Sequence, residues 1–265
     1  MSDGSKLGLG GHSFIEPLGN DPPASFEEQC ALVSACLDHG IHLLDTTYYQ
    51  ERVALGNVLH ELGRREEAQI MVWNFFRQPE QEDDLVPFTP YEPNHFDTIL
   101  QELRTDRLDV LVVHVHADRE KLGHELDLAR GWMDSGAVGS VALGMIEPEY
   151  LDDLPEGHPV SAVLAPYNAF NREAAAAFER ARALGLRCIA LSPFIRGWKL
   201  DEIGGDKAHV SDLLLRWVTE QELVDTVIVS MRRATWVAAN RASERRGALS
   251  DEEQRKLQGW LTRIG

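Results

Sequence analysis

The sequence predicts an α/β fold in which a single (β/α)₈ TIM barrel occupies residues 1–265. Short apolar segments alternate with longer amphipathic segments from one end of the chain to the other, a pattern typical of parallel sheets. There are eight such apolar segments, the number that closes a barrel, and 265 residues suffice for a barrel of one domain. Hydrophobic residues make up 43% of the chain, as in other folded globular domains.

Each element follows from its local pattern. In chain order, the apolar runs predict strands at Leu7–Gly10, Ile41–Thr46, Gln69–Trp73, Asp109–His114, Gly139–Gly144, Ala162–Ala165, Arg187–Leu191 and Thr226–Val229. The amphipathic runs predict helices at Phe26–His39, Val53–Leu62, Phe96–Arg104, Glu120–Asp134, Arg172–Ala183 and Val210–Glu220. Gly40 and Gly185 are typical helix C-caps. The polar segment Gln78–Pro93 is expected either to form a lid over the C-terminal face or to be solvated, and Arg241–Lys256 to form a solvated helix.

The net charge of −17 argues against two classes of partner. Nucleic acids and anionic membranes bind basic surfaces, and Lys and Arg form no run longer than two residues, as at Arg232–Arg233 and Arg245–Arg246. No apolar run approaches the length of a membrane span, and the N-terminus lacks the pattern of a signal peptide. We therefore expect a cytoplasmic monomer or small homo-oligomer that acts on a small molecule. The three cysteines lack metal-ligand spacing and are expected to be buried, reduced thiols.

Polar side chains stand at the ends of several expected strands, on the barrel face that carries active sites. Asp45 ends the second strand, and we favour a functional role for it over a structural cap. His114 ends the fourth strand, and His116 lies two residues further, so both are expected on one side. Such a pair can bind a metal together with His12 or Asp45. Because no further ligand-spaced set occurs, we predict no metal and interpret His116 as a substrate contact or an exposed residue.

Aromatic residues gather near the second and third strands. They are Tyr48, Trp73, Phe75 and Phe76. This grouping is compatible with a pocket for a flat or sugar-like ligand, and equally with core packing. Glu147, near the end of the fifth strand, is either an acid–base group or a solvated residue. The residues that we expect at the substrate are His12, Trp73, His116 and Glu147.

Segments spread over nearly the whole chain resemble the aldo-keto reductases in their order and spacing. They are LGLGG, GIHLLDTTYYQERVALGNVL, RLDVLVVH, GAVGSVALG, APYNAFNR, ALSPFIRGW and VIVSMRRATWVAAN. This resemblance implies the same barrel and the reduction of a carbonyl compound by NADPH.

The resemblance also implies a proton relay. In the family a Tyr donates a proton to the carbonyl, a Lys lowers the pKa of that Tyr, an Asp pairs with the Lys, and a His orients the substrate. Asp45 and His114 match the Asp and the His. Tyr49 matches the Tyr if one residue is deleted, and Tyr48 if two are. Asn74 stands where the family has its Lys, and an uncharged amide cannot shift the pKa of a phenol as an ammonium does.

The expected cofactor contacts are retained at one end only. The loop after the seventh strand and the eighth βα unit supply the expected contacts Ser192, Phe194, Arg196, Gly197, Arg232 and Asn240. At the nicotinamide end, Ile146-Glu147 and Leu164 replace the residues that hold the carboxamide in the family, and Leu191 replaces the stacking Tyr. NADPH is therefore a possible cofactor that we expect to bind weakly or not at all.

Three functions follow from these observations. The family resemblance favours an NADPH-linked carbonyl reductase with an altered tetrad. The missing residues favour, almost equally, a cofactor-independent enzyme for elimination, isomerisation or cyclisation, in which Asp45, a Tyr and His114 are acid and base. A non-catalytic ligand-binding barrel ranks third, because polar residues remain at several strand ends.

Overall fold

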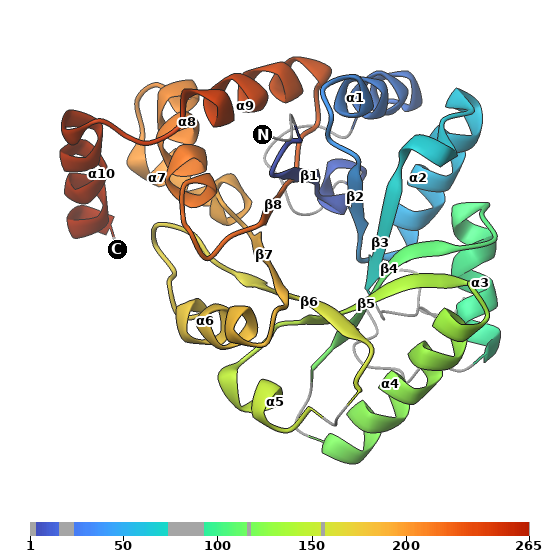
Figure 1. Ribbon diagram of the computed structural model, residues 1–265. Helices are drawn as coiled ribbons and strands as arrows, with labels where there is room; N and C mark the ends of the chain where they lie inside the picture. The colour runs from blue at the N-terminus through green and yellow to red at the C-terminus, as the bar shows by residue number, and fades with distance from the viewer. Residues whose placement is uncertain (1–3, 16–23, 74–92, 116–117, 155–156, 265) are drawn as a thin grey trace.

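The computed structural model describes residues 4–15, 24–73, 93–115, 118–154 and 157–264. Within these ranges eight parallel strands pair in chain order, and the last pairs with the first, so the predicted TIM barrel is confirmed (Figure 1). The strands are β1 (Leu7–Leu9), β2 (Leu43–Thr46), β3 (Gln69–Trp73), β4 (Leu108–His114), β5 (Val138–Gly144), β6 (Val160–Pro166), β7 (Arg187–Leu191) and β8 (Thr226–Val229).

Helices surround the strands (Figure 1). They are α1 (Phe26–Asp38), α2 (Tyr49–Leu62), α3 (Pro93–Leu103), α4 (Arg119–Asp134), α5 (Pro148–Asp152), α6 (Ala175–Ala183), α7 (Trp198–Ile203), α8 (Lys207–Thr219), α9 (Ala234–Arg246) and α10 (Asp251–Ile264). In the described residues there are also short 3₁₀ helices, η1 (Gly11–Ser13), η2 (Arg65–Glu67) and η3 (Ile195–Gly197). Among the helices in the described ranges, none has both the length and the apolar character of a transmembrane helix.

The strand predictions agree with the structure to within a few residues, whereas two helical segments differ. Helix α2 begins at Tyr49 rather than Val53, because the Glu51 carboxylate accepts hydrogen bonds from the preceding backbone and stabilises an additional turn. The prediction of one solvated helix over Arg241–Lys256 was wrong. Gly247, with φ of 69°, separates α9 from α10, and Arg241 is buried with its Nε donating to the His39 carbonyl. Of the segment Gln78–Pro93, only Pro93 lies in the described residues, as the first residue of α3.

Apolar side chains fill both the inside and the outside of the barrel. The interior cluster consists of Met71, Trp73, Val112, Ala142, Ala162, Leu164, Ile189 and Ile228. A larger cluster fills the space between the strands and the surrounding helices, and a third joins α7, α8 and α10. Because the interior is packed, the site can only lie at an end of the barrel, and the polar strand-end residues lie at the carboxyl end.

Candidate active site

Asp45, on β2, is buried at the carboxyl end of the barrel. Its Oδ1 accepts a hydrogen bond of 2.9 Å from Nε1 of Trp73, and the backbone of Gly11 also donates to its carboxyl group. Burial, together with the negative charge of Glu51, raises the pKa of Asp45 to about 8, although the two hydrogen bonds act in the opposite direction. Asp45 is therefore mainly neutral at pH 7 and can donate a proton. Its carboxyl group is engaged by Trp73, although the lysine that pairs with the family's Asp is missing.

Trp73 contacts residues of three other strands at this end of the barrel. It ends β3, and its indole lies so close to Gly144 of β5 that a Cβ added there would come within 2.2 Å of the Cζ3 atom. Its ring centroid lies 6.0 Å from that of His114, the last residue of β4, in an edge-on arrangement. The glycine at position 144 thus permits the indole to lie across the barrel interior while its Nε1 reaches Asp45.

This packing predicts the effect of Gly144→Ala. The added methyl group should displace the indole, break its bond to Asp45 and lower the free energy of unfolding by about 1–3 kcal/mol, the usual cost of overpacking. Urea denaturation and near-ultraviolet circular dichroism measure both changes. Gly131→Ala on α4 is the matched control: its Cβ meets nothing within 4 Å, so it should be neutral or stabilising. Equal stability of the two variants would contradict the tight packing of Trp73.

A buried Glu–His pair lies beside Asp45, and the sequence analysis missed its acidic member. His12, in η1 after β1, donates from Nδ1 to Oε1 of Glu51 over 2.8 Å. The Glu51 side chain is 0% exposed and that of His12 is 26% exposed. Since a carboxylate only accepts hydrogen bonds, the neutral form of His12 carries its proton on Nδ1 and leaves Nε2 as an acceptor. Nε2 has no protein partner within the described ranges.

Backbone groups hold the other oxygen of Glu51. Oε2 accepts from Thr47 N at 2.6 Å and from Tyr48 N at 3.2 Å. Gly11 lies against this carboxylate, and a Cβ there would come within 2.1 Å of Oε2. A signal for Glu51 was present in the sequence. It lies four residues before Leu55 and eight before Leu59, both of which are buried, so it shares the apolar face of α2. An acidic residue on that face is buried and needs partners.

The two candidate tyrosines lie at the start of α2. Tyr48 is the N-cap residue, and its ring stacks on the His12 imidazole with centroids 5.6 Å apart and planes inclined by 10°. Tyr49 is the first helical residue, and both tyrosines are half-buried. The structure therefore brings Tyr48 to His12, while the assignment of the catalytic Tyr stays a prediction.

The remaining predicted substrate and catalytic residues are placed as follows. His114 is half-buried and donates from Nδ1 to the Val115 carbonyl at 2.7 Å. Glu147 is exposed and is the N-cap residue of α5. Asn74 and His116 lie outside the described residues, as do Phe75 and Phe76. No group of three His, Cys, Asp or Glu side chains in the described part of the chain could hold a metal ion.

The expected phosphate end of a cofactor site forms a tight loop after β7. Ser192 has φ of 57° and is exposed, and Gly197, with φ of 81°, is the N-cap residue of α7. Phe194 packs against two of the apolar clusters, and the side chain of Arg196 is outside the described atoms.

The other two expected phosphate contacts lie in the eighth βα unit. Arg232 is 5% exposed, and its Nη2 donates to the Ile15 carbonyl at 2.8 Å, so the guanidinium holds the loop after β1. Asn240 is half-buried on α9.

At the expected nicotinamide end three of the four side chains are apolar, and the fourth, Glu147, is exposed. Leu164 is 0% exposed and belongs to the barrel interior, and Leu191 packs against the same cluster. Ile146 is also buried, and its backbone N donates to the Leu164 carbonyl. A carboxamide would meet no polar side chain at these three positions, so they do not fit a nicotinamide ring.

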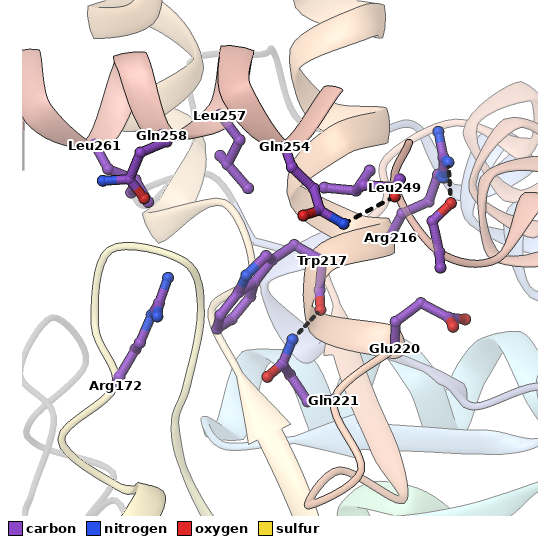
Figure 2. A pocket seen from close by; sticks show the side chains of 11 residues that line it. Arg172, Arg216, Trp217, Glu220, Gln221, Leu249, Gln254, Leu257, Gln258 and Leu261 are labelled. Carbon is purple, nitrogen blue, oxygen red and sulfur yellow. Dashed lines mark hydrogen bonds between the residues drawn. The ribbon is translucent and has the colours of Figure 1, made fainter. Parts of the chain in front are cut away.

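A groove of about 310 Å³ lies elsewhere, between α8, α10 and the loop that precedes α6 (Figure 2). It is lined by Arg172, Arg216, Trp217, Glu220, Gln221, Ala248, Leu249, Gln254, Leu257, Gln258 and Leu261. Arg216 is held by Glu253 and by two backbone carbonyls, and the amides of Gln221 and Gln254 also donate to backbone. The groove shares no residue with the cluster around Asp45 and His12, which is where the acid–base groups gather.

Comparison with known proteins places this geometry in context. The model of the aldo/keto reductase family matches residues 6–209. Aldo-keto reductase YhdN of Bacillus subtilis is 23% identical over 185 residues, which cover 64% of this chain and 52% of the relative. This chain thus spans about half the length of that curated relative.

Solved structures support the fold. The holo form of aldo-keto reductase AKR11C1 from Bacillus halodurans matches with a TM-score of 0.78 and 18% identity, covering 97% of this chain and 92% of that one. An aldo/keto reductase from Klebsiella pneumoniae, solved in complex with NADP and acetate, matches with a TM-score of 0.75 and 17% identity, with the same coverage.

Proposed function

We propose that this chain, which belongs to the aldo/keto reductase family, is an enzyme that acts on the carbonyl group of a small molecule. In this proposal it acts by proton transfer, without a nicotinamide cofactor. The observation that carries this proposal is the His12–Glu51 pair, placed after β1 beside the neutral carboxyl group of Asp45. A histidine whose Nδ1 proton is held by a buried carboxylate is oriented as a general base.

The chemistry follows from the protonation states. Nε2 of His12 removes a proton from the carbon next to the carbonyl group, and Glu51 stabilises the imidazolium that forms. Asp45, protonated at neutral pH, supplies the proton for the carbonyl oxygen, so that an enol forms without a free enolate charge. Return of the proton to a neighbouring carbon gives an isomer, and loss of a leaving group gives an elimination product.

Reduction by NADPH is the second candidate function. The tight loop after β7, with Ser192 and Gly197 at positive φ, favours it, because it retains the expected phosphate end of the cofactor site. The apolar residues Ile146, Leu164 and Leu191 argue against it, since the nicotinamide would lose its hydrogen bonds and its stacking partner.

A titration with NADPH and with adenosine 2′,5′-bisphosphate separates the two candidates. Each lost buried hydrogen bond costs about 0.5–1.5 kcal/mol, so the dissociation constant of NADPH should be about a hundredfold above that of a micromolar ligand. NADPH should then bind no more tightly than the bisphosphate. Calorimetry measures both affinities. In parallel, the loss of the α-proton signals of hydroxyacetone in D₂O, followed by NMR, reports proton transfer directly. Micromolar NADPH binding with oxidation of NADPH by an aldehyde would make the reductase the better assignment.

A further inference from the structure

Arg52, next to Glu51 on α2, has a side chain that is 0% exposed and is paired with Glu102 of α3. We propose that Arg52 and Glu102 are positioning residues that orient His12 through Glu51. This proposal rests on the proposed role of His12 as the base. Their effect on His12 would pass through Glu51 and the Thr47–Tyr48 peptide group.

A continuous chain of polar contacts joins Glu102 to His12. Nε of Arg52 donates to Oε2 of Glu102 over 2.6 Å, and its Nη1 donates to the Thr47 carbonyl over 3.3 Å. The N–H of the same peptide group, that of Tyr48, donates to Oε2 of Glu51. The other oxygen of Glu51 accepts from His12.

The Thr47–Tyr48 peptide group is the central link. Its carbonyl faces the Arg52 guanidinium and its N–H faces the Glu51 carboxylate, so both ends of the peptide dipole meet a charge of the favourable sign. In a buried environment such contacts strengthen one another. If Arg52 is displaced, the peptide group loses the contact that fixes its carbonyl. Its N–H, which donates to Glu51, is then no longer held in a fixed orientation.

Helix α3 packs closely against α2, and this packing fixes the position of Glu102. At Gly56, one turn after Arg52, a Cβ would come within 2.5 Å of the Glu102 carbonyl oxygen and 2.7 Å of the Leu103 carbonyl carbon. The two helices therefore approach at van der Waals distance, with Glu102 at the point of contact. The Arg52 side chain is 0% exposed and that of Glu102 is 14% exposed, so loss of the Glu102 carboxylate would remove a charge partner of a buried guanidinium.

The test uses the His12 Nδ1 proton of the full-length protein, observed by ¹H and ¹⁵N NMR with His12→Gln to assign it. A proton held by a buried carboxylate should exchange slowly enough to give a separate resonance. We expect Glu102→Gln, which keeps the shape of the side chain and removes its charge, to speed exchange of this proton with water at least tenfold, or to abolish the resonance. Arg52→Lys should do the same. Glu66→Gln, which removes the partner of Arg107 on the surface, is the matched control and should leave the resonance unchanged.

The proposal would be overturned if the His12 resonance were unchanged in Glu102→Gln. It would also be overturned if the wild-type protein gave no such resonance. If Arg52→Lys fails to fold, Glu102→Gln decides the question alone. Turnover is the second readout: where hydroxyacetone exchange is measurable, Glu102→Gln should lower kcat about tenfold with little change in KM. The protein could also show a His12 resonance that responds to Glu102→Gln and yet exchange no substrate proton. That result would support the positioning role and contradict the proposed function.

Discussion

Replacing His12 by Asn should lower the rate of substrate proton exchange by about 10²–10⁴-fold, because the general base is lost. Glu51→Gln should have a comparable effect although it leaves the imidazole in place. The amide can present an N–H where the carboxylate presented an acceptor, and His12 would then carry its proton on Nε2, the atom that must accept. The measurement is deuterium exchange at the α-carbon of a carbonyl substrate, followed by NMR.

The control for these variants is His42→Asn. His42 precedes β2, at the opposite end of the barrel from Asp45, and its Nδ1 donates to the Glu67 carbonyl. Its loss should leave the exchange rate unchanged, and His12→Asn and Glu51→Gln should unfold at nearly the wild-type temperature. Full activity of Glu51→Gln would show that the Glu–His pair is structural rather than catalytic.

Replacing Asp45 by Asn should change how stability depends on pH. In the folded protein the pKa of Asp45 is raised to about 8, against 3.8 for an unperturbed Asp, so between these values the folded state holds a proton that the unfolded state has released. The stabilisation from Asp45 is fully present below about pH 4 and is lost as pH rises through 8. Asn does not titrate, so the free energy of unfolding of Asp45→Asn, relative to wild type, should rise by up to about 1.4 kcal/mol per pH unit across this window.

Urea denaturation of both proteins at pH 5, 6 and 7 measures this difference. Asn retains an oxygen that accepts from Trp73 Nε1, so the comparison isolates the proton. Asp106→Asn is the control, because its side chain is 92% exposed, and its stability should follow wild type across the same range. Parallel curves for Asp45→Asn and wild type would mean that Asp45 is ionised in the folded protein, and that it cannot be the acid in the proposed mechanism.

The site was predictable where it depends on strand ends. Asp45 and His114 were identified because each lies at the carboxyl end of an apolar strand, and parallel strands in a barrel bring their carboxyl ends to one face. Trp73 was identified as a pocket or core residue, and the structure places it between these two residues. Arg232 matched a phosphate contact by its position in the chain, but the structure shows its guanidinium on the Ile15 carbonyl.

The sequence by itself determined the barrel, the face on which the polar strand ends gather, and the substitution of Asn74 for the expected lysine. These depend on periodicity and on residue identity, which are local properties. Only the tertiary structure decided that His12 and Glu51, 39 residues apart, form a hydrogen-bonded pair, and that Asp45 is neutral near pH 7. The pairing depends on the adjacency of β1 and β2 and on the rotation of α2 about its axis. The pKa of Asp45 depends on how much water and how much charge surround its carboxyl group, and packing sets both.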